Sequence, residues 1–525
     1  MNSINTKGST LLIIGLALLS GLFGSCSKDL GNYNYSEISE LAISNLEQQY
    51  AVLTGVDTLI LSPIVGGDLA GSSAADLEYR WTLRMQGTSR AADTIGTSAQ
   101  LKFPVGVEKG QYLLEFRVKD PHTGIVFSKR ANLSVATPFT RGILMLGETQ
   151  TGEVEAQMLS MIADTILMDG LIKNSGLALT LEKPGEIMYG GGFVDSHKLV
   201  WIFTESGSYF FERERMSSAS TNTISSFLMP TDPIDIQQEQ PMAMAPQIIK
   251  SDGTVSDEFS RAIVTRTGNI YTTSTLLGQG EFYNPINRLA SPFERLLPAA
   301  PFLMYPLGSM SSMMWYNQEE NRFMALAGFM FIDHSSYPAD AAGDVFSWNL
   351  GSQGKELIYT ENTFNRDGGF VNGNTFAVVG EGPQQRYIYK FHARGSSPVK
   401  LASYGVKEIA FNFHQAEQYA FSSNRTVVFY TVNQRLFAYD YNPGNERLYQ
   451  LDPLPGQDIT MIKFDTQQNP AENSLYIAGY KAGQGTLQRF NLDSNPNQVA
   501  LQAVPGAAWE GLLKIKSINW KAERY

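Results

Sequence analysis

The sequence predicts an all-β protein in which an N-terminal β-sandwich precedes a β-propeller of seven blades. Three observations lead to this fold class. Apolar and polar residues alternate strictly in short segments of the first third of the chain. Hairpin-like units then recur, at intervals of roughly 60 residues early and roughly 50 late. Long amphipathic helical patterns are scarce throughout.

The chain begins with the pattern of a secretory signal. Residues 1–10 are polar and contain Lys7, residues 11–23 form an apolar run, and small residues then lead to Cys26, the one cysteine among 525 residues. A short membrane anchor is the alternative. The apolar run is shorter than the roughly 20 residues that a spanning helix needs, which favours a cleaved signal.

The ending "FGSC" resembles the bacterial lipobox, with Phe23 where leucine is common. The resemblance implies that residues 1–25 are a lipoprotein signal peptide and that Cys26 becomes the first mature residue, carrying several acyl chains such as palmitate. Two or more chains hold a protein stably in a membrane. No thiol then remains for disulfides, metal binding or nucleophilic attack.

The residues after the cysteine suggest where the anchor goes. Ser27, Lys28 and Asp29 resemble the short export signal of surface lipoproteins in Bacteroidetes-type bacteria, although the usual second acid is replaced by Leu30. We therefore expect an outer-membrane, lipid-anchored protein that faces the cell exterior. Residues 26–37 are polar and rich in Gly and Asn, which is typical of a flexible tether.

Charge argues against nucleic-acid partners. The chain has 40 Lys and Arg against 51 Asp and Glu, and removal of residues 1–25 takes away Lys7, so the mature net charge is 39 − 51 = −12. Nucleic-acid phosphates need clusters of Lys and Arg, and the sequence has no such run. The acidic balance instead favours a soluble extracytoplasmic domain.

Residues 38–137 are predicted to form a PKD/Ig-like β-sandwich. In "LEYRWTLR" and "LEFRVKD", apolar residues occupy every second position, as in half-buried antiparallel strands. The turn "DPHTG" follows, and shorter strand candidates lie in "YAVL", "DTLILS", "AQLKF" and "IVFSKRANLSV". Six or seven strands in about 100 residues around one Trp are typical of such a sandwich.

Residues 138–525 are predicted to form the propeller. Seven segments indicate one blade each: "GILMLGE", "KLVWIFTESGSYFFERE", "RAIVTRTGNIYTTS", "NRFMALAGFMF", "TFAVVGEGPQQRYIYKFHA", "TVVFYTVNQRLFAYDYN" and "SLYIAGYKAGQGTLQRFNL". Five of them read as two strands joined by a turn of four or five residues, and "GILMLGE" and "NRFMALAGFMF" are added as further anchors. We expect "KIKSINW", near the C-terminus, to pair with the Gly142 strand and close the ring. A pair of large sandwiches is the alternative.

This arrangement resembles the PKD-like family lipoproteins of Bacteroidetes. The similarity lies in the lipobox, the opening "KDLGNYNYSEI", the strand "EYRWTL" and the segment "YLLEFRVKDPHTGIVFS". It implies an accessory surface lipoprotein beside a starch-utilisation-type uptake system, whose TonB-dependent barrel and capture lipoprotein would be its partners. It implies a binding role and assigns neither a ligand nor catalytic residues.

Motifs for catalysis or metal binding are weak. The histidines are too far apart for a zinc site and read as solvated or hydrogen-bonded, and "YGGGF" at Tyr189–Phe193 lacks the Lys-Ser/Thr of a phosphate loop. Isolated acids near strand ends are expected by chance among 51. These histidines and acids are His122, His197, His334, His392, His414, Glu205, Asp333 and Glu381. We predict no metal, no organic cofactor and no catalytic residue.

Aromatic residues offer a binding hypothesis. Two trios at period two share a strand face, and "MMWYN" at Met313–Asn317 is similar. Exposed, such rings stack on sugars or peptide side chains; packing between blades is the interpretation we favour. The trios are Tyr387, Tyr389 and Phe391, and Phe437, Tyr439 and Tyr441.

The function predicted from these observations is non-catalytic binding of a glycan or peptide in a TonB-dependent uptake system. A propeller-based polysaccharide lyase or glycoside hydrolase is the alternative, because propellers assemble sites from distant loops. Two carboxylates about 5–10 Å apart in a polar funnel would favour the enzyme. A third interpretation is an adhesion or structural surface protein.

Overall fold

The computed structural model describes residues 40–68, 73, 75–162, 164–249, 255, 260–274, 280–293, 295–308, 310–329, 332–364 and 373–523. Within these ranges there is no helix long and apolar enough to cross a membrane. The described helices are single 3₁₀ turns: η2 (Asp195–His197), η3 (Ile224–Phe227), η4 (Gly351–Gln353), η5 (Phe413–Gln415) and η6 (Pro470–Glu472). Strands form the rest of the regular structure, so the predicted all-β fold class is confirmed.

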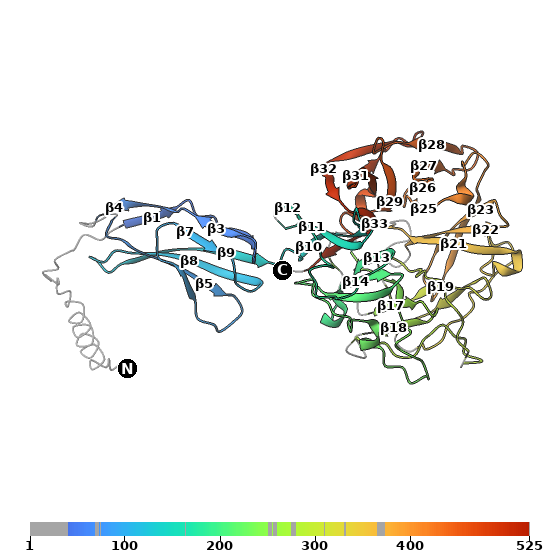
Figure 1. Ribbon diagram of the computed structural model, residues 1–525, viewed down its shortest axis with the longest axis horizontal. Coiled ribbons are helices and arrows are strands. Elements are labelled where there is room, and N and C mark those ends of the chain that lie inside the picture. Colours follow the sequence, from blue (N-terminus) through green and yellow to red (C-terminus); the bar gives the residue numbers. More distant parts are fainter. Residues whose placement is uncertain are drawn as a thin grey trace, which may run out of the picture.

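The first nine described strands form the sandwich (Figure 1). They are β1 (Glu40–Ser44), β2 (Gln49–Leu53), β3 (Thr58–Leu61), β4 (Ile64–Asp68), β5 (Glu78–Met85), β6 (Asp93–Gly96), β7 (Leu101–Pro104), β8 (Gly110–Lys119) and β9 (Val126–Ala136). One sheet has the order β2-β9-β8-β5-β6, and the pairs β1-β4 and β3-β7 face it. The strand β2 runs parallel to β9, and the other pairings are antiparallel.

The sandwich core forms where the sequence alternates. Trp81, Phe116 and Leu133 are fully buried, and Trp81 lies opposite Phe116 across β5 and β8, with ring centroids 4.3 Å apart. The indole Nε1 of Trp81 donates to the carbonyl of Ser98 at 2.9 Å, so the one polar atom of this side chain is satisfied. The alternating strand pattern therefore predicted the buried face correctly.

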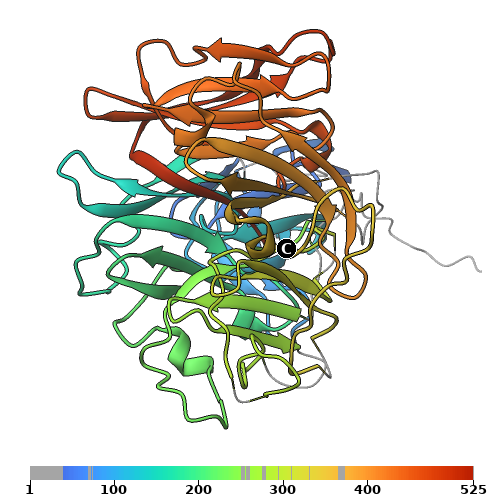
Figure 2. The ribbon, with the colours of Figure 1, turned by 90° about the vertical axis from the view of Figure 1, so that its right-hand side faces the viewer.

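Seven further sheets, counted over the described residues, follow one another around a ring (Figure 2). Blade 1 consists of β10 (Arg141–Glu148), β11 (Val154–Met161), β12 (Thr165–Met168) and the C-terminal strand β33 (Lys514–Ala522). Blade 2 consists of β13 (Pro184–Tyr189), β14 (Leu199–Thr204) and β15 (Gly207–Glu212). Blade 3 consists of β16 (Pro241–Met244), β17 (Ser260–Thr265) and β18 (Ile270–Ser274). Blade 4 consists of β19 (Met313–Asn317) and β20 (Arg322–Leu326). Blade 5 is β21 (Lys355–Asn362), β22 (Asn374–Glu381), β23 (Gln385–His392), β24 (Val399–Gly405). Blade 6 is β25 (Gln418–Phe421), β26 (Val427–Val432), β27 (Arg435–Asp440), β28 (Arg447–Leu451), and blade 7 is β29 (Asp458–Phe464), β30 (Leu475–Lys481), β31 (Gln484–Leu492), β32 (Leu501–Leu512).

Apolar clusters between neighbouring blades hold the ring together. Each of the seven neighbouring pairs shares one cluster of buried residues, including the pair formed by blade 7 and blade 1. In that last cluster, Met461 and Tyr476 of blade 7 pack with Ile143 and Ile518 of blade 1. A single small sheet cannot bury both of its faces, so stacking around an axis is what stabilises each blade. The seven-bladed prediction is confirmed, and the alternative of paired sandwiches is wrong.

The C-terminal strand closes the ring as predicted. The strand β33 pairs antiparallel with β10, from Arg141 opposite Ala522 to Glu148 opposite Lys514. The register shifts between Leu146 and Gly147. A Cβ at Gly147 would lie 2.3 Å from the carbonyl oxygen of Lys514, so this close approach requires glycine.

Two details differ from the sequence prediction. In four of the five predicted hairpin segments the turn is shorter than four residues, because the strand ends pair more completely. For example, only Asn433 and Gln434 join β26 to β27, both at positive φ. Blade 4 is also less regular than its repeat suggested. Its inner segment forms only isolated bridges, Ala299 with Asn317 and Met304 with Met314, because Pro301 between them has no N–H for a ladder.

Candidate functional site

A pocket of about 420 Å³ lies where the inner strands of four blades begin. Blade 1 contributes the start of β33 and the end of β10, blade 2 the start of β13, blade 6 the start of β25 and blade 7 the start of β29. We call it the mouth pocket. Its lining residues are Glu148, Lys183, Pro184, Glu417, Gln418, Gln434, Ile459, Thr460, Lys514, Ile515 and Lys516.

Lysines outnumber acids in this lining, and two of the three lysines have local partners. Lys514 lies 3.3 Å from Glu148, and Lys183 lies 2.7 Å from Glu205. Both pairs are largely exposed to solvent, so water and salt weaken them. Lys516 is exposed and has no hydrogen bond or ion pair to the described residues.

The opposite wall is held by Glu417 and Gln418 of blade 6. The Glu417 carboxylate accepts the backbone N–H groups of Asn433, at 3.1 Å, and Gln434, at 3.3 Å. The side chain of Gln418 joins blade 6 to blade 7, because it accepts the N–H of Ile462 and donates to the carbonyl of Thr460. These contacts fix the shape of the wall. The Glu417 carboxylate is hydrogen-bonded to uncharged backbone N–H groups.

Four charged side chains from different inner strands interact electrostatically near the pocket; we call them the axial charges. They are Glu186 of β13, Glu361 of β21, Lys463 of β29 and Lys516 of β33, which belongs to both sets. Glu186 is exposed within the ring, whereas Glu361 and Lys463 are half-buried. The electrostatic centre of the propeller is therefore assembled from four blades.

Enclosure by the surrounding blades shifts the pKa of three axial charges. Desolvation raises the pKa of Glu361 to about 8, although the N–H of Phe421 and the charge of Lys463 oppose this. Desolvation also raises the pKa of Glu186 and lowers that of Lys463, whose ammonium donates to the carbonyl of Ile518 at 2.9 Å. Glu361 is thus mostly protonated at neutral pH and can donate a hydrogen bond.

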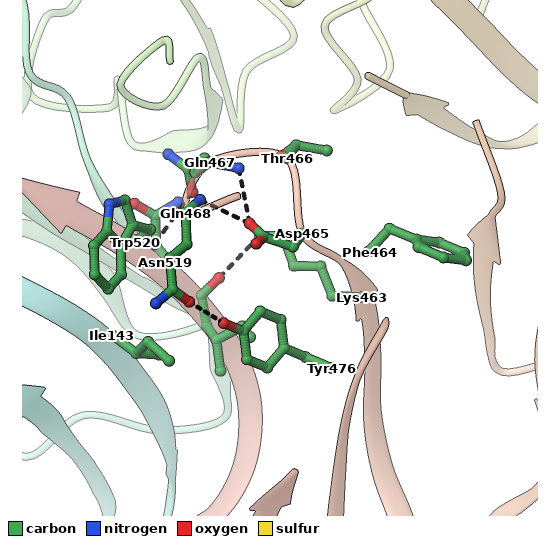
Figure 3. A pocket seen from close by; sticks show the side chains of 11 residues that line it. Ile143, Lys463, Phe464, Asp465, Thr466, Gln467, Gln468, Tyr476, Asn519 and Trp520 are labelled. Carbon is green, nitrogen blue, oxygen red and sulfur yellow. Dashed lines mark hydrogen bonds between the residues drawn. The ribbon is translucent and has the colours of Figure 1, made fainter. Parts of the chain in front are cut away.

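At the other end of the axis, side chains fill the space. The pocket in Figure 3 has a volume of about 20 Å³, which is room for about one water molecule. Asp465 accepts the N–H groups of Gln467 and Gln468 at 2.9 and 2.8 Å, as the dashed lines show. The amide of Gln467 in turn donates to the carbonyl of Gln247 and accepts the N–H of Trp520.

The sandwich contacts this filled end. Lys109 of the sandwich lies 2.6 Å from Glu523, just after β33, and 3.1 Å from Glu214, just after β15. Glu523 also pairs with Lys521, which is fully buried and donates to the carbonyl of Phe139. Glu523 follows the end of β33, whose beginning lines the mouth pocket, so the sandwich and the mouth pocket lie on opposite faces of the ring.

The acids proposed from the sequence are not brought together. Glu205 pairs with Lys183 in blade 2, Asp333 lies 3.0 Å from His334 in blade 4, and Glu381 accepts the hydroxyl of Tyr387 in blade 5. The acids that do line the mouth pocket, Glu148 and Glu417, were not singled out. They come from distant blades and share no local motif.

The other chemical candidates have structural explanations. The ring of buried His197 contacts the carbonyl of Gly280, and the ring of His392 contacts the carbonyl of Gly373. Within the described part of the chain, no group of three or more His, Cys, Asp and Glu residues is arranged to hold a metal ion. The "YGGGF" segment turns the chain after β13: Gly191 has φ of 62°, and a Cβ there would meet Gln247. The lipidation residue Cys26 and the export residues Ser27, Lys28 and Asp29 lie outside the described residues.

The aromatic residues pack between blades, as the sequence analysis favoured. Tyr389 and Phe391 are buried between blades 4 and 5, with Tyr387 packed beside them. The trio Phe437, Tyr439 and Tyr441 is buried between blades 5 and 6. All five residues of "MMWYN" are buried. None of these rings lines the mouth pocket.

The first third of the chain has a family assignment. Residues 26–178 match the PKD-like family. The match begins at Cys26 and continues past the sandwich through β10, β11 and β12 of blade 1. The resemblance to this family is confirmed for that part of the chain. No curated protein sequence matches the chain.

Several solved structures are similar to the chain at low identity. A quinoprotein alcohol dehydrogenase-like protein of Bacteroides thetaiotaomicron has 10% identity and a TM-score of 0.34, over 91% of this chain and 99% of that one. YCF48 of Cyanidioschyzon merolae has 10% identity and a TM-score of 0.34, over 63% and 88%. The extracellular domain of a candidate one-component system of B. thetaiotaomicron has 10% identity and a TM-score of 0.32, over 86% and 66%. The propeller assignment rests on the strand pairing above, and no function is carried over from these proteins.

Proposed function

We propose that this protein is a lipoprotein of the outer membrane, anchored through Cys26 and facing the cell exterior. In this proposal it is a non-catalytic accessory component of a TonB-dependent uptake system, and its propeller holds a glycan or peptide. The ring face with the mouth pocket would contact the ligand, and the sandwich would act as a spacer.

One observation carries the proposal: the order of parts along the molecule. The strand β1, the first described element, lies with β4 at the end of the sandwich away from the propeller (Figure 1). The propeller follows, and its mouth pocket lies on the face opposite the sandwich. An anchor at the N-terminus would thus hold the pocket away from the membrane. The family match that begins at Cys26 also supports this order.

The proposal is tested by isolating the lipidated full-length protein from detergent-solubilised outer membrane and identifying the chains that co-purify. We expect a TonB-dependent barrel and its capture lipoprotein. The Cys26→Ser variant, which cannot be acylated, is the matched control and is expected in the soluble fraction without these partners. Recovery of the wild-type protein alone would contradict the uptake role.

A second candidate function is a polysaccharide lyase or glycoside hydrolase, and one observation favours it. Glu186 and Glu361 both have raised pKa values and both interact with Lys463 at the centre of the ring. Carboxyl groups whose environments shift their pKa values are the usual acids and bases of such enzymes. Turnover of surface polysaccharides that is abolished in Glu361→Gln would establish the enzyme, whereas binding without turnover supports the accessory role.

A further inference from the structure

The mouth pocket holds a cation, the Lys516 ammonium, that forms no ion pair with any acid among the described residues. The strand β33 places Lys514 and Lys516 two residues apart, and both line the pocket. Lys514 has Glu148 as a partner, but Lys516 forms no ion pair with an acid among the described residues. In a chain with a formal net charge of −11, a pocket with three lysines and two acids differs in sign from the molecule as a whole.

Neither acid of the pocket lining forms an ion pair with Lys516. The carboxylate of Glu417 is held by two backbone N–H groups of the β26–β27 turn. Glu148 is engaged with Lys514. Near the pocket, Glu186 interacts with both Lys463 and Lys516, and desolvation raises the pKa of Glu186, so its proton is retained to a higher pH than in water.

A second, independent observation concerns Thr460, which also lines the pocket. Its side-chain hydroxyl is buried and has no hydrogen-bond partner within the described part of the chain. Buried polar groups in proteins are nearly always hydrogen-bonded, so an unpaired hydroxyl in a pocket wall indicates a missing partner. Because the hydroxyl is enclosed, a ligand in the pocket would supply this partner only after a rotation of the Thr460 side chain toward it.

The lining also indicates which class of ligand fits. It contains no aromatic ring, so a neutral sugar would find no surface on which to stack. It offers ammonium groups, the amide of Gln434 and the hydroxyl of Thr460, and only three apolar residues. Such donors suit a hydroxyl-rich ligand that carries a carboxylate. The volume of about 420 Å³ lies within the range of small-ligand sites.

We propose that the mouth pocket binds an acidic oligosaccharide, and that Lys516 pairs with the carboxylate of one uronic acid unit. Lys514 lies beside this carboxylate, and Gln434 and Thr460 face the sugar hydroxyls. The proposal rests on the proposed binding function and names its ligand class. A peptide with a free C-terminal carboxylate carries the same charge, and it is the competing outcome of the test.

The test uses the full-length lipidated protein in neutral detergent micelles and isothermal titration calorimetry. The probes are tri-galacturonate, the matched neutral galactotriose, and an acetylated tripeptide with a free carboxylate. We expect tri-galacturonate to bind, galactotriose to bind at least tenfold more weakly, and the peptide not to bind. Because the contact joins two charges, raising the salt concentration should weaken the binding of tri-galacturonate.

Variants of Lys516 sharpen the test. Lys516→Gln should weaken tri-galacturonate binding by about ten- to a hundredfold, as expected when one charged hydrogen bond is lost. Lys516→Arg keeps the charge and should retain most of the affinity. Lys481→Gln removes an exposed lysine at the end of β30, outside the pocket lining, and should leave the affinity unchanged.

The outcomes of these experiments separate the two proposals. Equal binding of tri-galacturonate and galactotriose, or peptide binding instead of sugar binding, would overturn the inference and leave the accessory binding role intact. Absence of tri-galacturonate binding also overturns it. The uptake role is judged separately, by whether the barrel and capture lipoprotein co-purify.

Discussion

The two ends of the propeller axis use charge in opposite ways. At the sandwich end, Lys109, Lys521 and Glu523 form a compact group of mutually paired charges, and Lys521 is completely buried. At the mouth, Lys516 is exposed and unpaired among the described residues. Both lysines belong to one strand, β33, five residues apart. The comparison shows that the partner and the solvent, rather than the residue type, decide whether a lysine is structural or available to a ligand.

The largest expected effect comes from breaking the paired end. Glu523→Ala removes the carboxylate shared by Lys109 and Lys521, which leaves a buried ammonium uncompensated. We expect a loss of about 3–5 kcal/mol in the free energy of unfolding, measured by urea denaturation. Glu205→Ala, which removes an exposed partner of Lys183, is the control and should cost less than about 1 kcal/mol. Equal effects would mean that the buried group adds no stability.

An intermediate effect is expected between the two ends, at Glu361. Its ordinary pKa of 4.5 is raised to about 8 in the folded protein, so the unfolded chain releases this proton first as the pH rises. The folded state therefore loses stability between about pH 4.5 and pH 8, relative to a variant that does not titrate. Glu361→Gln should be more stable than the wild type by about 2 kcal/mol at pH 6, and the difference should keep growing up to about pH 8.

The pH profile of unfolding checks this prediction for Glu361. Wild type and Glu361→Gln should converge below about pH 4.5, where the carboxyl is protonated in both states, and should separate progressively above it. A constant difference across the whole pH range would show that the substitution acts through packing, and would contradict the raised pKa.

The smallest stability effect is expected at the mouth. Lys516→Gln removes an exposed, unpaired charge, so the free energy of unfolding should change by less than about 0.5 kcal/mol. Thermal unfolding of this variant beside Glu523→Ala compares the two ends directly. A loss of several kcal/mol at Lys516 would show that this lysine supports the fold, and the contrast between the ends would disappear.

The sequence predicted the regular parts of the fold because hairpins have local signals. Seven segments, five of them hairpins, marked seven blades, and "KIKSINW" was identified as the closing strand. The inner segment of blade 4 carried no such signal, since Pro301 interrupts its strand pattern. The predicted turns were too long because the strands continue into residues next to the turn. Those residues do not alternate between apolar and polar, so the sequence pattern did not assign them to the strands.

The candidate site was not predictable in the same way. Its lining comes from residues near positions 148, 183, 417–434, 459 and 514–516, which only the closed ring brings together. One local signal was present: Lys514 and Lys516 alternate with Ile515 on a strand already assigned to ring closure. An alternating strand that exposes two lysines beside the axis is a recognisable pattern once the blade order is known.

Closure of the ring by β33 has a consequence for how the chain folds as it is made. The strand β10 emerges from the ribosome early, and its partner β33 is synthesised more than 360 residues later. Until then, one edge of blade 1 has unpaired backbone groups, which are prone to pair with other chains. Contacts so distant in sequence also form slowly. Until β33 is made, that edge is open to pairing with other chains, and the mouth pocket, which β33 helps to line, is incomplete.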